Sequence, residues 1–410
     1  MSVDTPAPPA PVSPLDRIHS IDALRGFAVL GILIINVQWM SMIEGAATNP
    51  TIFPPFEGAN RWVWILSHLL AEQKFMTIFS MLFGAGVILM ASRVEARGLS
   101  SKGLHYRRMM VLLLIGLVHA YLIWFGDVLV TYALCGMLVY PFRNRAPRTL
   151  IIAGVAVVAV SSILSLASGW SMQFWPRETM NGMIEDWQPG PERIAQDMAA
   201  YRGSYLEVLR YRAPSAFAFH TSVFLFWALW RAGGMMLAGM GLFKLGVFSA
   251  RRSRQFYLTL LGTGLFIGIP IVAWGILLNL RAAWAIEYSF FFGIQFNYWA
   301  SLIVSMGWVA LVMLACQSRG FAPFTTPLVA VGRMALTNYL MQSVLCTWIF
   351  YGYGLSLYGR VERPGQLMIV LGIWVFQLIV SPLWLRHLRF GPAEWFWRSL
   401  TYGRRQPMRM

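Results

Sequence analysis

Apolar and polar stretches alternate along the chain, and the apolar stretches are long. Most of them run for about 20 residues without a charge, enough for a helix to cross a hydrocarbon core of roughly 30 Å. The pattern therefore predicts an all-α fold, a polytopic transmembrane helix bundle of about ten spans. The spans are expected at residues 21–43, 75–92, 108–125, 128–142, 148–168, 218–244, 256–279, 292–316, 327–351 and 366–386.

The segments between the predicted spans separate by charge. A ten-span topology places four basic segments on one side: RVEARGLSSKGLHYRR, FRNRAPR, ARRSR and the tail from RHLRF to RRQPMRM. Because Lys and Arg are retained in cytoplasmic loops, we expect this side, and with it both termini, to be cytoplasmic.

Two further segments lie outside the spans. Residues 61–75, RWVWILSHLLAEQKF, are apolar, but a crossing there would invert every later basic loop, so we expect an interfacial or re-entrant helix on the outer side. Residues 169–217 are expected to form a long outer loop that caps the outer mouth. The predicted organisation is a disordered, Pro-rich cytoplasmic tail (1–16), a transmembrane domain (17–386) and a basic cytoplasmic tail (387–410).

The basic tail contains FGPAEWFWRSLTYGRRQPM. Its aromatic residues and basic end are typical of an amphipathic helix lying on the anionic inner leaflet. Alternatively, Glu394 and Arg398, four residues apart on a helix, form a gate or latch at the inner mouth.

Composition excludes a soluble globular protein, since 57% of the residues are hydrophobic and only 12% are charged. The net charge of +16 does not indicate nucleic-acid binding, because the basic residues fall in short loops and not on one soluble face. Cys135, Cys316 and Cys346 lack the spacing of a disulfide framework or zinc site, so they are expected to be packing residues, with no metal. P-loop, GxSxG, HExxH and dinucleotide-binding signatures are absent.

Polar residues inside the spans form two tiers. On the inner tier, Asp22 and Arg25 are three residues apart on one helix face, and Arg333 starts another outward-running span at the same depth. Two guanidinium groups at one depth predict an anion clamp, because guanidinium binds phosphate bidentately. The alternative is that each arginine extends to the headgroups or pairs with Asp22 or Glu394.

The outer tier comprises Asn36, His119, Asp127, Asn338 and Gln342. His119 lies eight residues before Asp127, and Gly126 is expected to separate two antiparallel spans between them. An imidazole and a carboxylate near one membrane face could act as a general base and its orienting partner. The alternatives are a packing histidine and a helix N-cap aspartate.

Three further polar positions are candidates. His68 and Glu72, four apart in the interfacial segment, form either a second acid/base pair or an ordinary polar helix face. Arg231 lies near mid-membrane and needs a partner or a wet cavity. His220 is expected to be interfacial.

Five sequence blocks carry a family resemblance. They are R-x-x-x-I-D-A-L-R-G-F-A-x-x-G-I-L-x-x-N, K-F-x-T-x-F-S-x-L-F-G-A-G, G-L-x-H-A-Y-L-I-W-x-G-D-x-L, G-R-M-A-L-T-N-Y-L-x-Q-S and F-G-P-A-E-W-x-W-R-S-L-T-Y-G. Over nearly the whole chain they resemble the YeiB-like family of bacterial inner-membrane proteins, which implies a bacterial inner (plasma) membrane location. His119 belongs to this family's signature.

The first block also resembles, more distantly, the transmembrane acyltransferases. In the sugar O-acyltransferases the first helix carries Arg-x10-His. Here Arg25 matches, and Asn36 stands at the histidine position. In the heparan-glucosaminide acetyltransferases the first helix also has Asn, and the catalytic histidine falls in the following outer segment, near His68 in this chain.

This resemblance implies a membrane acyltransferase that moves an acyl group, such as acetyl, from cytoplasmic acyl-CoA to a hydroxyl or amine acceptor, such as a sugar, reached from the outer face. The implied residues are Arg25 and Arg333 for the CoA phosphates, His119 with Asp127 or His68 with Glu72 for proton transfer, and Asn36, Asn338 or Gln342 for the oxyanion. The alternatives are a secondary transporter and a non-catalytic scaffold or lipid-binding subunit. The expected partners are the bilayer and the acceptor. The oligomeric state stays open and includes a homodimer.

Overall fold

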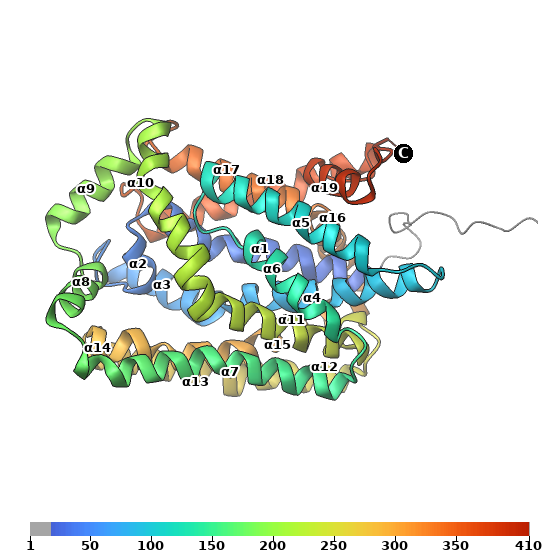
Figure 1. The fold of residues 1–410 in the computed structure, drawn as a ribbon, viewed down its shortest axis with the longest axis horizontal. Helices are drawn as coiled ribbons and strands as arrows, with labels where there is room; N and C mark the ends of the chain where they lie inside the picture. The colour runs from blue at the N-terminus through green and yellow to red at the C-terminus, as the bar shows by residue number, and fades with distance from the viewer. Residues whose placement is uncertain (1–17, 410) are drawn as a thin grey trace, which may run out of the picture.

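The computed structural model describes residues 18–409 and is helical throughout (Figure 1). Within this range, the β contacts are limited to one isolated antiparallel bridge between Leu388 and Arg409. The predicted all-α bundle is confirmed. The predicted disordered tail, residues 1–16, lies outside the described range.

Eight helical stretches in the described range are long and apolar enough to cross a membrane. They are α1 (His19–Ser41); α3 (Gly58–Leu70) with α4 (Lys74–Glu95); α5 (Lys102–Val118) with the π-helical η2 (His119–Ile123); α7 (Pro147–Ser171) with η4 (Met172–Phe174); α10 (Tyr205–Ala218), η5 (Phe219–Ala228) and α11 (Leu229–Lys244); α12 (Arg254–Thr263), η7 (Gly264–Gly268) and α13 (Ile269–Arg281); α14 (Ile286–Tyr288), η8 (Ser289–Gly293) and α15 (Gln295–Gln317); and α18 (Arg363–His387).

The other two predicted spans are shorter or interrupted. The first is α6 (Leu129–Val139), extended by the 3-10 turn η3 (Tyr140–Phe142). The second is divided at Met334 into α16 (Ala322–Arg333) and α17 (Ala335–Phe350). The remaining elements are α2 (Glu44–Thr48), α8 (Arg177–Trp187), α9 (Pro191–Tyr201), η6 (Val247–Ser249), η9 (Arg319–Phe321) and α19 (Pro392–Tyr402).

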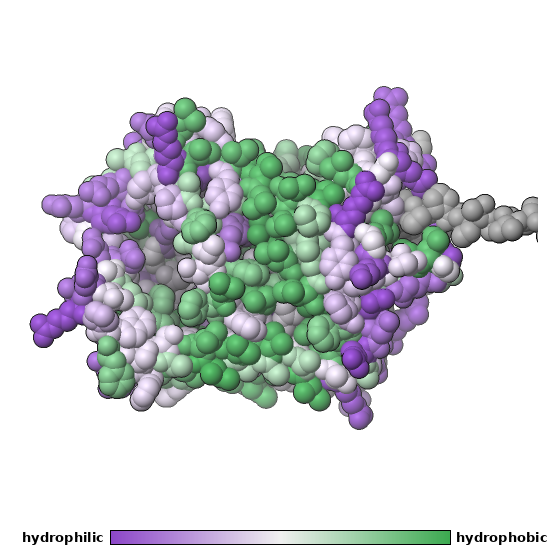
Figure 2. Space-filling view, viewed as in Figure 1, coloured by the Kyte–Doolittle hydropathy of each residue, from purple (hydrophilic) through white to green (hydrophobic). Residues whose placement is uncertain are grey.

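On the face that Figure 2 shows, an apolar band lies between two polar ends. Large apolar side chains are exposed on several helices: Phe266, Ile152 and Met368 are 80%, 69% and 66% exposed. Apolar side chains at such exposure on a soluble protein would form an unusually large patch, whereas lipid tails suit them. The chain is a multi-pass membrane protein.

The basic loops meet at one end of the bundle, the end that also carries α19 and the C-terminus (Figure 1). Arg143, after α6, donates to Glu95 at the end of α4. Lys244, at the end of α11, donates to the carbonyl of Arg145. We call this the inner end and the opposite end the outer end.

The segments at the outer end are more helical than expected. Residues 169–217, expected as a loop, contain α8, α9 and most of α10, which continues into a membrane-length helix. The segment 61–75 does not cross separately: α3 is followed by a three-residue turn and then by α4, and the two form one candidate span. Trp62 of α3 is 64% exposed, whereas Trp64 is buried against Trp284.

Helices α1 and α16 are in close backbone contact. A Cβ on Gly26 would lie 2.0 Å from the carbonyl oxygen of Leu328, and one on Gly332 would lie 1.8 Å from that of Asp22. Glycine therefore lets the two backbones touch, as small residues do in membrane helix pairs. This contact holds Arg25 and Arg333, which are each next to one of these glycines, at the same level of the bundle.

We predict that Gly332→Ala destabilises the fold by about 1–3 kcal/mol, because the added methyl group has no space and α1 must move away from α16. The matched control is Gly372→Ala in α18, where a Cβ meets nothing within 4 Å. Replacing that helical glycine should raise stability by up to about 1 kcal/mol. Unfolding in mixed detergent micelles measures both. Equal effects of the two substitutions would contradict the packing role.

Candidate functional site

A cavity of ≈ 250 Å³ occupies the inner half of the bundle, between α1, α4, α5, α6, α16, α17 and α19. Along α1 it extends from Ile21 to Ile32, a rise of about 16 Å. Its charged and histidine lining residues are Asp22, Arg25, Arg93, His105, Arg108, Arg333, Glu394 and Arg398.

The lining changes from charged to apolar with depth. On α1, Arg25 is followed by Val29 and Ile32 towards the outer end. On α4, which runs in the opposite direction, Phe79 precedes Arg93. The charged residues on both helices therefore lie at the inner end. The cavity has a cationic mouth at this end and an apolar part towards the outer end.

The structure brings Arg25 and Arg333 to this one cavity, as the sequence predicted. Arg25 donates to Asp22 over 2.8 Å, which is the pairing that the sequence analysis named as the alternative to an anion clamp. Arg333 is the last residue of α16, at the break before α17. The predicted pair belongs to a group of five arginines on five different helices.

Glu394 of α19 caps the helix that begins after this break. Its carboxylate accepts the backbone N–H groups of Leu336 and Thr337 at 2.7 and 3.1 Å and the Thr337 hydroxyl at 2.6 Å. Burial raises the pKa of Glu394, because the loss of hydration outweighs these hydrogen bonds. The tail helix, α19, is thus attached to α17. Arg398, also on α19, lines the cavity, and its guanidinium lies over the Phe390 ring.

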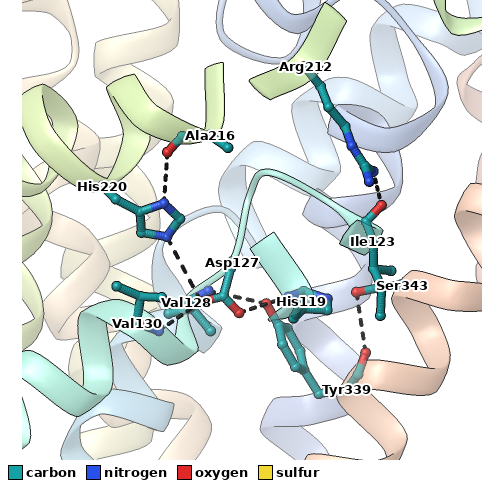
Figure 3. Close-up of polar contacts among 10 residues, drawn as sticks. All are labelled: His119, Ile123, Asp127, Val128, Val130, Arg212, Ala216, His220, Tyr339 and Ser343. Carbon is teal, nitrogen blue, oxygen red and sulfur yellow. Dashed lines mark hydrogen bonds and ion pairs between the residues drawn. The ribbon is translucent and has the colours of Figure 1, made fainter. Parts of the chain in front are cut away.

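The second site lies further out and is centred on Asp127 (Figure 3). His119 begins the π-helical turn η2, a kind of turn that is frequent at functional sites, and its Nδ1 lies 2.8 Å from Asp127 Oδ1. Asp127 Oδ2 accepts the backbone N–H of Val130 at 2.7 Å, so the carboxylate also caps α6. His119 and Asp127 are 1% and 0% exposed, and His119 Nε2 has no hydrogen-bond partner among the described residues.

A second histidine faces the same carboxylate. His220 is at the start of the π-helical η5, and its Nε2 lies 4.0 Å from Asp127 Oδ2. Its Nδ1 is bonded to the carbonyl oxygen of Ala216 over 2.7 Å. No sequence pattern indicates this contact, since His220 and Asp127 are far apart in the chain.

Arg212 of α10 fixes the backbone that carries His119. This fully buried guanidinium donates to the carbonyl oxygens of Ile123 and Tyr121 (Figure 3). These are among the last carbonyls of η2, where a cation also interacts favourably with the helix dipole. The position of His119 therefore depends on α10 as well as on its own helix.

Tyr339 of α17 lies between the cavity and the histidine site. Its ring lines the cavity, and the ring centroid is 5.2 Å from that of His119. Its hydroxyl oxygen accepts the backbone N–H of Val128 over 3.3 Å. His119 itself is not among the cavity-lining residues, so the two predicted tiers are adjacent but separated by this one aromatic ring.

The side chains of the other predicted acid/base pair, His68 and Glu72, are in contact at the outer end. Trp64 stacks on His68 with ring centroids 4.7 Å apart. The pair lines a separate pocket of ≈ 20 Å³, about the size of one water molecule. Lys74, fully buried, donates to the His68 carbonyl oxygen and to the Asn297 side chain.

The predicted amide residues lie elsewhere. Asn338 donates to the Val331 carbonyl oxygen and to Ser381. Gln342 donates to the Val29 carbonyl oxygen and to Gln377. These amide groups join α17 to α1 and α18, and Asn36 is half-buried on α1. None of the three lines the cavity.

Arg231 has the partners that its depth requires. It donates to the Tyr298 carbonyl oxygen, Thr77 and Ser301 at 2.6–2.8 Å. All these acceptors are neutral, and the guanidinium does not line the cavity. The three cysteines are free, as expected for packing residues.

Sequence reasoning missed Arg93, Arg108 and His105 as site residues. All three lie in the basic segment RVEARGLSSKGLHYRR, which the charge pattern assigned to a cytoplasmic loop. In the structure α4 and α5 extend through the ends of this segment, so these side chains face the cavity. The available signal was their closeness to the predicted spans 75–92 and 108–125: Arg93 directly follows the first, Arg108 begins the second, and His105 precedes it by less than one helical turn.

The fold and the cavity define a multi-pass helical membrane protein with an arginine-lined inner chamber. Residues 242–404 match the family model described as "Protein of unknown function (DUF418)". The chain is 32% identical to the Bacillus subtilis (strain 168) protein YxaH, over 96% of each chain, and 29% identical to Escherichia coli (strain K12) YeiB, over 94% of this chain and 97% of YeiB. It belongs to the YeiB-like, DUF418 family.

We predict that the cap made by Glu394 is sensitive to pH. The group's usual pKa is 4.5, and the folded protein binds this proton more tightly than the unfolded chain. The stability of the wild type relative to Glu394→Gln should therefore be greatest below about pH 4.5 and fall as the pH rises through the raised pKa. Unfolding midpoints of the two proteins over about pH 4 to 8 measure this. The control is Glu185→Gln at an exposed position, and a pH-independent difference for Glu394→Gln would refute the prediction.

Proposed function

We propose that this protein is a membrane acyltransferase. It transfers an acyl group from acyl-CoA, bound from the inner end, to a hydroxyl or amine acceptor, such as a sugar, that arrives from the outer end. One observation carries the proposal: the arginine-lined cavity reaches Tyr339, and the ring of Tyr339 lies beside His119 of the buried His119–Asp127 pair.

The cavity mouth suits the phosphates of CoA. Five guanidinium groups converge there, from Arg25, Arg93, Arg108, Arg333 and Arg398. Guanidinium forks bind phosphate bidentately and stay charged at any physiological pH. The thioester arm of CoA then extends through the apolar, outer part of the cavity towards Tyr339. The bound donor supplies the activated acyl carbon.

His119 is the proposed general base. Its Nδ1 faces Asp127, so Nε2 remains available to take the proton of the acceptor. A bond forms between the acyl carbon and the acceptor oxygen or nitrogen, the carbon–sulfur bond breaks, and the proton passes from His119 to the departing thiolate. The ring of Tyr339 has to move aside for the donor to reach His119.

The proposal also fixes an orientation. The end with the basic loops, α19 and the C-terminus faces the cytoplasm of a bacterial cell, and the membrane is the inner membrane. His68 and Glu72 at the outer end would then meet the acceptor first, and they are the second candidate pair for proton transfer. The acyl group, whether acetyl or longer, and the oligomeric state are open to experiment.

One observation favours a secondary transporter instead. The ninth predicted span is interrupted at Met334, and the start of α17 lies at the cavity, capped by Glu394. Discontinuous helices whose ends face a mid-bundle site are typical of transporters. Arg231 gives this alternative no support, because its hydrogen bonds are all within packed helices.

We predict that the purified protein binds acyl-CoA and that Arg25→Gln or Arg333→Gln weakens binding roughly 10- to 100-fold, since each loses a charged hydrogen bond worth about 1.5–3 kcal/mol. Calorimetry in detergent with acetyl-CoA and a longer-chain acyl-CoA measures it. Arg148→Gln, at an exposed position of α7, is the control and should bind as the wild type does. Absence of any CoA binding by the wild type would overturn the proposal.

We predict that His119→Asn lowers acyl transfer by about 10²- to 10⁴-fold without weakening CoA binding, because it removes only the base. Labelled acetyl-CoA and a mixed sugar and amine panel provide the assay. His68→Asn is the matched comparison: a greater loss there would move the base to the outer pair. Acceptor uptake into vesicles without acylation would favour the transporter.

A further inference from the structure

The arrangement around Asp127 contains more than a general base and its partner. Its carboxylate has no exposed surface, yet two imidazoles address its two oxygens, His119 at Oδ1 and His220 at Oδ2. The side chain of His220 is 9% exposed and that of His119 is 1% exposed. The two histidines come from different helices and are held in different ways.

Hydrogen-bond chemistry assigns a proton to one nitrogen of each ring. A carbonyl oxygen only accepts, so the 2.7 Å contact with Ala216 requires a proton on His220 Nδ1. In a neutral His220, Nε2 would then carry a lone pair directed at the Asp127 carboxylate 4.0 Å away. Two acceptors would face each other. A second proton on His220 replaces this repulsion by an ion pair.

The contact of His119 with the carboxylate has the opposite consequence. One proton, on Nδ1, satisfies Asp127 Oδ1, and Nε2 has no partner that would need a second one. A neutral His119 therefore satisfies the carboxylate, and no acceptor at Nε2 calls for a second proton. The cluster as a whole is neutral when Asp127 is ionised and only one of the two imidazoles is charged, which is the state a buried site favours.

We propose that His220 is the resting counter-ion of Asp127. By carrying the positive charge, it keeps the carboxylate ionised and leaves His119 neutral, with Nε2 ready to accept a proton. His220 is a positioning residue that acts through Asp127. The part concerning catalysis rests on the proposed function, whereas the charge assignment concerns the resting protein alone.

The other polar groups near the cluster do not take this role. Arg212 directs its guanidinium at the carbonyl oxygens of Ile123 and Tyr121. The Tyr121 ring lies 6.3 Å from His220 and the Tyr339 hydroxyl accepts from Val128, so neither supplies a positive charge.

The test is ¹⁵N NMR of histidine-labelled protein in lipid nanodiscs at about pH 7. The chain has six histidines, so single replacements assign each signal. We expect His220 to show two protonated nitrogens and His119 one protonated and one bare nitrogen. In His220→Asn, His119 becomes the remaining counter-ion and should gain a second proton. A role in packing alone would leave the protonation of His119 unchanged.

Two control variants complete the experiment. His119→Asn should leave His220 doubly protonated, and Asp127→Asn should leave both imidazoles neutral. A neutral His220 in the wild type, or an unchanged His119 in His220→Asn, overturns the inference. Should His220→Asn not fold, the wild-type and His119→Asn spectra still decide it.

The measurement uses neither donor nor acceptor, so it separates this inference from the proposed function. Absence of acyl transfer would leave the charge assignment standing. Acyl transfer by a protein with a neutral His220 would remove only the assignment.

Discussion

A charge at membrane depth must be paired, hydrogen-bonded or in contact with water, and this constraint arranges the polar residues of the bundle. An ionised side chain at the bilayer centre costs at least about 2.5–3.5 kcal/mol without such compensation. Arg231 and Lys74 are compensated by hydrogen bonds that they donate to neutral oxygens of neighbouring helices. Asp127 is compensated by its contacts with two histidines and by a hydrogen bond from a backbone N–H. Arg25, Arg93, Arg108, Arg333 and Arg398 border the cavity.

The cavity is bounded by a close helix pair and by an interrupted helix. Contact of α1 with α16 at Gly26 and Gly332 draws these helices together on one side. At Met334 the helix is interrupted, so the first N–H groups of α17 are free of helical partners and donate to the carboxylate of Glu394. The tail helix thereby becomes a wall of the chamber.

The same connections link the two sites physically. Glu394 binds the first turn of α17, and Tyr339 follows one turn later on that helix, between the cavity and His119. A ligand that displaces α19 would therefore act on the one ring that separates the chamber from the Asp127 cluster. In the proposed reaction, α17 therefore couples donor binding in the cavity to access to His119.

Local pattern in the sequence determined the bundle, the basic end and the Arg25–Asp22 contact, because apolar length, loop charge and helical spacing act over a few residues. The pairing of His119 with Asp127 was within reach because only a short turn separates them. The contact of His220 with that carboxylate, the five-arginine mouth and the cap of α17 by Glu394 were decided only by tertiary structure. Each joins helices that are distant in the chain, and their meeting depends on packing across the whole bundle, which no local pattern encodes.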